Sequence, residues 1–388
     1  MVTFPNSACG ATSGFNGTCY TAAECLSLGG TASGTCASSF GVCCVFSISC
    51  GTTSSQNNTY AIISSYSTSA DKDPCTYTYC KSSSDVCKLR IDYDTMVLTA
   101  PQTTMVPTTA LFYGISKGSC YYDTLSISSP GFQAPPTVCG YNTGQHMWVP
   151  ASDSCTTINI DIDTGTTTTT RKWQIKVSQY ECGNMMAPEN DCLQYFTEST
   201  GTIATFNWDT SATTVASSQT HLQNQHYDIC IRRARSSCSL CLSPQITSTT
   251  TGTAGSYGLG ASSDGSAPKN ALGSTCTGVT TAPAAVGYGD YIEIVNLQPS
   301  IGTTGTLTTA NRMCSNIFNA ITTATIAHAT ACTWATPFKV GVHFDNEEAL
   351  KAACASPNLK TCENDVAATT GAGYGTSGFW LAYWQNTC

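Results

Sequence analysis

The fold is decided by the stretch Cys120-Tyr-Tyr-Asp-Thr-Leu-Ser-Ile…Val-Cys139-Gly-Tyr-Asn-Thr-Gly-Gln-His-Met-Trp-Val149. Its first part alternates the apolar residues Leu125 and Ile127 with polar neighbours, and its last part alternates again. Alternation with a period of two is typical of strands that are buried on one face. Prolines and a glycine between the two runs predict a loop. The stretch therefore predicts an antiparallel hairpin stapled by a Cys120–Cys139 disulfide.

The composition around this stretch favours strands throughout. The chain has 388 residues, enough for two or three domains that each bury a core. Ser and Thr make up roughly 27% of it and charged residues only 10%, far below the usual quarter. Helix formers are scarce, whereas Thr, Val, Ile and Tyr are plentiful, so we expect an all-β protein. A net charge of −8 argues against a nucleic-acid partner, and no apolar run is long enough to predict a membrane span.

Cysteine usage indicates the compartment. The 24 cysteines are spread along the whole chain, and no two CxxC motifs have zinc-finger spacing. Twelve disulfides are the simplest interpretation, which predicts a secreted, extracellular protein. Asn16 and Asn57 begin N-glycosylation sequons, as expected of a glycoprotein. The first residues are not those of a signal peptide, so we expect a leader that was removed or lies outside this numbering.

The opening stretch also resembles the second half of a CUB domain, an extracellular β-sandwich. The shared pattern is Cys120-x-x-Asp-x-Leu-x-Ile followed by Cys139-Gly. The first half is similar too: Cys50-Gly, then Asn57-Asn-Thr-Tyr, Cys75-Thr-Tyr-Thr-Tyr and Cys87-Lys-Leu-Arg-Ile-Asp-Tyr-Asp-Thr-Met. The sequence of these motifs resembles that of secreted arthropod proteins that join a short cysteine-rich head to CUB-like modules. This resemblance implies a fold and no particular activity.

Residues 1–49 are expected to form a small disulfide-rich head. The segment holds six cysteines and is too short to bury a core without them. Spacing alone allows 15 ways of pairing six cysteines. The final Cys-Cys makes the head resemble a clip domain, and this resemblance implies the pairs Cys9–Cys43, Cys19–Cys36 and Cys25–Cys44. The trypsin-like protease that commonly follows a clip domain is not found here, because its Gly-Asp-Ser-Gly-Gly motif does not occur.

Two CUB-like antiparallel β-sandwiches are expected after the head, at residues 50–183 and 184–388. Residues 379–388 parallel 173–182, and the run after Asp290 parallels the run after Asp123, which indicates an internal repeat. We expect a short helix near 347–353 and inserted loops over 244–289. The predicted pairs in the sandwiches are Cys50–Cys75, Cys80–Cys87, Cys120–Cys139, Cys155–Cys182, Cys192–Cys230, Cys238–Cys241, Cys276–Cys314, Cys332–Cys388 and Cys354–Cys362.

The most specific chemical prediction is a calcium site. Many CUB domains bind Ca²⁺ at one end of the sandwich through a Glu and two Asp, and Asp123 matches one of these positions by resemblance. Asp92 or Asp94 would supply another, since both lie on one strand face. The family's Glu has no counterpart between Cys50 and Cys120, so Asp71, Asp73 or Asn142 would have to complete the six to eight oxygens that calcium needs. In the second sandwich only Asp290 matches. The alternative is that Asp123 caps the sandwich end through hydrogen bonds.

No arrangement of residues predicts catalysis. No Gly-x-Ser-x-Gly elbow or phosphate-binding loop occurs, and His221 and His226 are five apart, which suits neither a helix face nor a strand face. We therefore expect no enzyme and no required cofactor. The first hypothesis is a secreted structural protein that assembles with copies of itself into a filament or matrix, because low charge leaves strand edges poorly protected. The second is a monomeric recognition module that binds an extracellular protein or glycan through loops.

Overall fold

The computed structural model divides into two compact units. It describes residues 3–66, 74–103, 117–163, 170–188, 192–215, 219–246, 255–259, 271–272, 290–300, 310–314, 317–320, 328–345, 348–349, 363–364 and 376–388. The first unit comprises Met1–Thr99, Asp123–Thr137 and Asn142–Glu189. The second comprises Ala100–Tyr122, Val138–Tyr141 and Asn190–Cys388. The head thus shares a unit with the first sandwich, and two segments of the expected first sandwich belong to the second unit.

The head folds around its disulfides. It contains β1 (Ala8–Gly10), β2 (Asn16–Tyr20), α1 (Ala22–Ser27), β3 (Thr31–Cys36), η1 (Ala37–Ser39) and β4 (Gly41–Ile48). Its three disulfides are Cys9–Cys43, Cys19–Cys36 and Cys25–Cys44, which are the pairs that the clip resemblance implied. Helix α1, which sequence reasoning missed, begins with a capping box. There Thr21 caps the backbone N–H of Glu24, and the Glu24 carboxylate accepts from the backbone N–H of Thr21.

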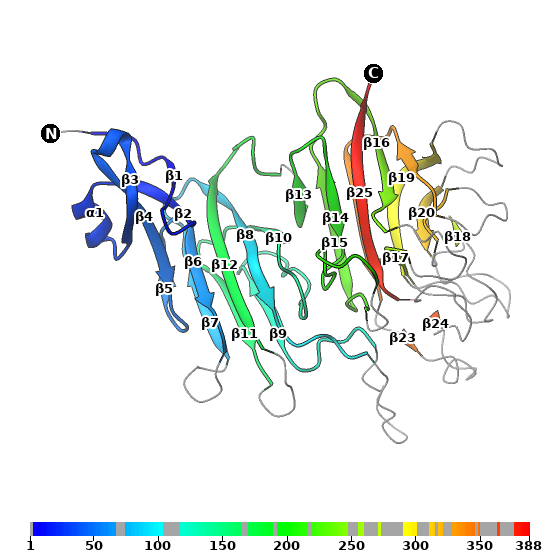
Figure 1. Cartoon of the computed structure of the whole chain (residues 1–388), viewed down its shortest axis with the longest axis horizontal. Coiled ribbons are helices and arrows are strands. Elements are labelled where there is room, and N and C mark those ends of the chain that lie inside the picture. Colours follow the sequence, from blue (N-terminus) through cyan, green and yellow to red (C-terminus); the bar gives the residue numbers. More distant parts are fainter. Residues whose placement is uncertain are drawn as a thin grey trace. The chain divides into compact units, whose positions relative to one another are not determined.

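The head is continuous with the first sandwich. The C-terminal half of β4 pairs in parallel with β6 (Thr59–Ile63). One sheet therefore runs through both, in the order β1-β2-β4-β6-β12-β8-β10, with β3 also paired to β4. The head was expected to be separate from the first sandwich. Instead, its last strand, β4, is part of the long sheet of that sandwich (Figure 1).

Two sheets make up the first sandwich. The remaining strands of the long sheet are β8 (Val86–Val97), β10 (His146–Pro150) and β12 (Lys172–Glu181). The second sheet has the order β5-β7-β11-β9, with β5 (Thr53–Ser54), β7 (Cys75–Tyr79), β9 (Thr124–Ser128) and β11 (Thr156–Asp161). Alternate side chains of both sheets are buried, and the Nε1–H of Trp173 donates to the Tyr77 hydroxyl at 3.0 Å between them. The predicted alternation of burial is confirmed in β9, whereas it is wrong in β10, where the four successive residues from His146 to Val149 are buried.

The expected hairpin is wrong because successive strands change sheets. The disulfide Cys120–Cys139 forms, but β9 pairs with β11 while β10 pairs with β8. Pairing of β7 with β11 places Cys80 beside Cys155, and those two are bonded. Pairing of β8 with β12 places Cys87 beside Cys182, and those two are bonded. The local pairs Cys80–Cys87 and Cys155–Cys182 would each have joined strands of different sheets. Cys50–Cys75 forms as predicted.

The second unit repeats this plan. Its main strands are β13 (Gln194–Phe196), β14 (Thr200–Ala204), β15 (Gln225–Ile231), β16 (Ser237–Pro244), β19 (Tyr291–Pro299), β21 (Ala331–Thr333), β22 (Phe338–Phe344) and β25 (Gly378–Thr387). Short strands are β17 (Tyr257–Gly258), β18 (Ala271–Leu272), β20 (Ala310–Cys314), β23 (Glu348–Ala349) and β24 (Glu363–Asn364). The order β13-β15-β22-β19 matches β5-β7-β11-β9, and β14-β25-β16-β21 matches β6-β12-β8-β10. The two halves join where β19 pairs with β21.

Disulfides of the second unit follow the same logic. Cys192–Cys230 forms as predicted. The pairs Cys238–Cys241 and Cys332–Cys388 are wrong: β16 lies between β25 and β21, so Cys238 bonds Cys388 and Cys241 bonds Cys332. Cys314 is disulfide-bonded, while its expected partner Cys276 and the pair Cys354–Cys362 lie outside the described residues. The helix expected near 347–353 is wrong at Glu348–Ala349, which forms strand β23.

Candidate functional site

Asp123, the centre of the expected calcium site, is fully engaged by protein groups. It lies just before β9, and its side chain is buried. Its Oδ2 accepts from the backbone N–H of Thr99 and from Nε of Arg171, each at 2.7 Å. Its Oδ1 accepts from the second guanidinium nitrogen at 3.0 Å and from the backbone N–H of Asp163 at 3.2 Å. A carboxylate has about four lone-pair positions, so none remains for a metal.

The arginine also sets the charge state of this carboxyl. Burial acts to raise the pKa of Asp123, but hydrogen bonds from Arg171 and Thr99 outweigh it and hold the pKa below its ordinary value. Arg171 is itself buried and donates a further hydrogen bond to the carbonyl oxygen of Asp163 at 2.7 Å. A guanidinium thus supplies at this end of the sandwich the positive charge that calcium was expected to supply. The capping alternative is the one that the geometry supports.

The other predicted ligands do not join Asp123. Asp92 pairs with Nε of Arg90 at 2.8 Å and with Nζ of Lys176 at 3.2 Å. Asp94 accepts from Nε2 of Gln174 at 3.0 Å. Asp71 and Asp73 fall outside the described residues, and the described part of the chain contains no group of three side chains placed to hold a metal. In this structure the three predicted ligands lie in separate interactions. Basic and amide side chains of β8 and β12 bond Asp92 and Asp94, whereas Arg171, just before β12, bonds Asp123. The geometry therefore does not bring these aspartates together as a calcium site.

The second unit has a related arrangement at Asp290. Its carboxylate and the ring of His221 are both fully buried, and Oδ2 lies 2.9 Å from Nε2. Oδ1 accepts from the backbone N–H of Asp345 at 2.7 Å, while Nδ1 of the ring lies 3.2 Å from the carbonyl oxygen of Leu222. Sequence reasoning found the two aspartates and missed Arg171 and His221. Their separations from the aspartates carry no motif, so only the folded sheet brings them together.

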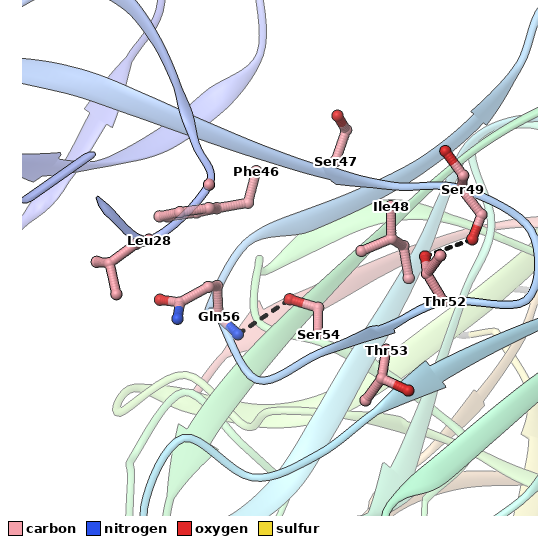
Figure 2. A pocket seen from close by; sticks show the side chains of 10 residues that line it. Leu28, Phe46, Ser47, Ile48, Ser49, Thr52, Thr53, Ser54 and Gln56 are labelled. Carbon is pink, nitrogen blue, oxygen red and sulfur yellow. Dashed lines mark hydrogen bonds between the residues drawn. The ribbon is translucent and has the colours of Figure 1, made fainter. Parts of the chain in front are cut away.

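A groove in the first unit is the candidate ligand-binding site. It has a volume of about 340 Å³. One wall is the end of β4, from Phe46 onward. The others are the segment that contains β5 and the two residues that follow α1 (Figure 2). The lining residues are Leu28, Gly29, Phe46, Ser47, Ile48, Ser49, Thr52, Thr53, Ser54 and Gln56. Three apolar side chains stand beside six hydroxyl or amide side chains, and none of the ten is charged.

The polar walls of the groove are held by short hydrogen bonds. The Thr52 hydroxyl donates to the carbonyl oxygen of Ser49, and the backbone N–H of Gln56 donates to the Ser54 hydroxyl at 3.1 Å. Phe46 packs with the Cys25–Cys44 disulfide, so the apolar end of the groove is rigid. The groove exists only because β4 belongs to both the head and the sandwich. Sequence reasoning treated these as separate parts and missed it.

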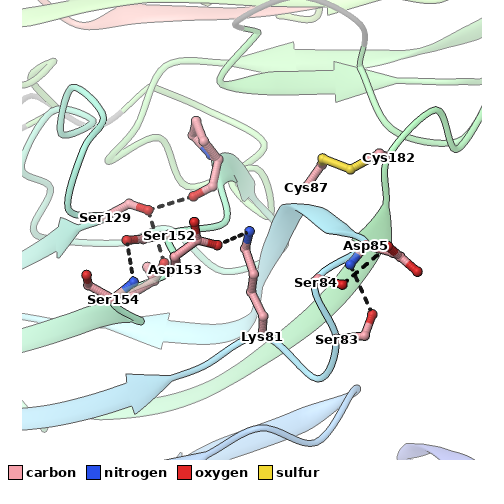
Figure 3. Close-up of polar contacts among 12 residues, drawn as sticks. Lys81, Ser83, Ser84, Asp85, Cys87, Ser129, Ser152, Asp153, Ser154 and Cys182 are labelled. Atoms are coloured by element: carbon pink, nitrogen blue, oxygen red, sulfur yellow. Dashed lines mark hydrogen bonds and ion pairs between the residues drawn. A yellow bond between two sulfur atoms is a disulfide. The ribbon is translucent and has the colours of Figure 1, made fainter.

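The loops at one end of the first sandwich form a second polar surface (Figure 3). Nζ of Lys81 lies 2.7 Å from Oδ1 of the exposed Asp153. Ser152 donates to the carbonyl oxygen of Pro130 at 2.7 Å, and the disulfide Cys87–Cys182 ties the neighbouring strands. These side chains bond one another and the backbone, so their polar atoms are engaged within the chain.

The comparisons agree with an extracellular β protein stapled by disulfides. A family model for the animal CUB domain matches residues 189–386, more than half of the chain. The chain therefore belongs to the CUB domain family. CUB domains are non-catalytic modules of extracellular proteins. None of the curated proteins compared with the chain matches it. No helix among the described residues is long and apolar enough to cross a membrane.

Three solved structures are similar to this chain, and two of them are of CUB domains. The CUB1-EGF-CUB2 domains of rat MASP-1 share 10% identity at a TM-score of 0.25, covering 86% of this chain and 100% of that one. The same region of human MASP-1/3 shares 11% identity at 0.22, covering 84% and 99%. The extracellular region of zebrafish Gpr126/Adgrg6 shares 12% identity at 0.24, covering 88% and 34%.

Proposed function

We propose that the protein is a secreted recognition module that binds a neutral glycan in the groove between the clip-like head and the first sandwich. The observation that carries the proposal is the lining: six hydroxyl or amide side chains and no charge, beside Leu28, Phe46 and Ile48. Hydroxyls both donate and accept, which matches the hydroxyls of a saccharide. The volume lies within the range of small-ligand pockets.

The test uses the full-length protein on an array of neutral and charged glycans. We expect binding to neutral glycans, and we expect Gln56→Arg to abolish it because a longer, charged side chain would then stand beside Leu28 and Phe46 in the groove. Ser84→Arg is the control for an added arginine, since Ser84 lies at the loop end shown in Figure 3. Glycan binding that survives Gln56→Arg, or a protein that binds no glycan, overturns the proposal.

Self-assembly is a second candidate because of the head's surface. Leu26 is 78% exposed, Phe40 64% and Leu28 40%, an unusual amount of apolar surface for so small a segment. Strand β4 is already paired to β6 of its own chain, so assembly would use these side chains rather than a donated strand. Sedimentation velocity at high concentration tests it: the parent should form polymers, and Leu26→Ser with Phe40→Ser should be monomeric. A monomeric parent eliminates this candidate.

A further inference from the structure

The outer face of the second unit's sheet gathers ionisable side chains around a glycine. Across strands β15, β22 and β19, His226 is opposite His343, which is opposite Tyr291. In the next row, Asp228 is opposite Gly341, which is opposite Glu293. Intervening residues of all three strands are buried, so these side chains point outward. In a chain with only 10% charged residues, this is a marked concentration.

Gly341 lets these side chains approach one another closely. A Cβ at this position would lie 3.1 Å from Nε2 of His343 and 3.4 Å from both Oδ1 of Asp228 and Cβ of Glu293. These contacts are tight, so an imidazole nitrogen and a carboxylate oxygen already close over the glycine, which is buried. The group itself faces solvent, because His226 is exposed and His343 and Glu293 are each about one-third exposed.

Distances among these groups are close to those of ligands on one metal. Nε2 of His343 and Oε2 of Glu293 are 3.7 Å apart. Two ligands at tetrahedral positions on one zinc ion are about 3.4 Å apart, from bond lengths of about 2.1 Å. The rings of His226 and His343 have centroids 6.0 Å apart. As the side chains stand, no three described groups converge on one point. The third ligand must therefore come from rotation of the exposed His226, a motion that costs an exposed side chain little.

We propose that His343, Glu293 and His226 bind a divalent transition-metal ion of the zinc class above Gly341, with Asp228 beside it and water completing the coordination. Imidazole nitrogens select such ions over calcium and magnesium, which prefer oxygen ligands. The site lies in the second unit and is independent of the glycan proposal, which concerns the first.

The surroundings prepare His343 for this role. The Tyr291 ring stacks on it at 4.7 Å between centroids and so orients the imidazole. Two cations work against the ion: Arg312, which lies over Tyr291, and Lys339, whose Nζ lies 2.9 Å from Oδ2 of Asp228.

The test is isothermal titration of metal-free, full-length protein with ZnCl2 at pH 7.5. We expect one Zn²⁺ per chain, and no binding of CaCl2 or MgCl2 above Gly341. His343→Ala, His226→Ala and Glu293→Gln should each weaken Zn²⁺ binding by at least about tenfold, since even indirect partners of a metal site are worth about that much. Lys339→Gln is the matched control: it changes a neighbour that repels the ion, so binding should be kept or strengthened.

Circular dichroism and melting curves establish that each variant is folded, which is expected for exposed positions. Zn²⁺ should also raise the melting temperature of the parent and leave that of the His226→Ala/His343→Ala double variant unchanged. A parent that binds no Zn²⁺, or a folded double variant that binds it as tightly as the parent, overturns the proposal.

Discussion

The Asp123–Arg171 pair allows a quantitative test of the first sandwich. Changing Arg171 to Met keeps most of the side-chain volume and removes the guanidinium. The buried carboxylate of Asp123 then keeps its neutral donors, the backbone N–H groups of Thr99 and Asp163 and the side chain of Thr99. Removing one partner of a buried ion pair costs about 3–5 kcal/mol, because the other charge is left without compensation. We expect that loss in the free energy of unfolding of the first unit.

The double variant Asp123→Asn/Arg171→Met separates charge from packing. It has no buried charge, so it should be more stable than Arg171→Met alone by roughly 2 kcal/mol or more. Hydrogen exchange followed by mass spectrometry in increasing guanidinium is the assay, because peptides from β9, β11 and β12 report on the first unit alone. If the single and double variants lose protection at the same guanidinium concentration, the carboxylate does not need the guanidinium and the reasoning fails.

Four further predictions concern two buried titratable groups, calcium and the cap of α1. The pKa of Asp123 is lower in the folded protein than in the unfolded chain. The stability that its charge contributes is therefore present above the unfolded pKa and is lost as pH falls through the folded pKa. Hydrogen exchange of β9 should accelerate below about pH 4, and unchanged exchange there would contradict this. Burial lowers the pKa of His328 from 6.5 to about 4. The second unit should therefore lose up to roughly 3 kcal/mol of stability as pH falls from 6.5 to 4, measured by hydrogen exchange of β21. A loss of stability confined to pH values below 4 would argue against this shift. Calcium and chelator should give equal melting of the first unit, and protection of β9 by calcium would restore the metal site. Thr21→Ala should destabilise α1 by about 1 kcal/mol through loss of its cap, whereas Thr53→Ala, on an exposed groove strand, should not.

Local patterns in the sequence determined the class of fold. Alternating apolar residues and scarce helix formers predicted the all-β architecture, and the strands β7, β9, β11 and β12 have the alternating burial that this implies. Resemblance to known modules supplied the three head disulfides and the pair Cys50–Cys75, and the internal repeat supplied Cys192–Cys230. These features were accessible because each depends on residues close together in the chain, or on a cysteine spacing shared with a known module.

Only the tertiary structure decided which strands are neighbours. Alternation shows which face of a strand is buried, but every strand offers the same backbone N–H and C=O groups to a partner, so it cannot distinguish a hairpin from a crossing between sheets. For that reason β9 and β10 were wrongly paired, and four disulfides were wrongly assigned with them and their counterparts. Pairing of the strands into sheets also brings Arg171 to Asp123 and His226 to His343. These residues are far apart in the chain, so their side chains meet only after the sheets have formed.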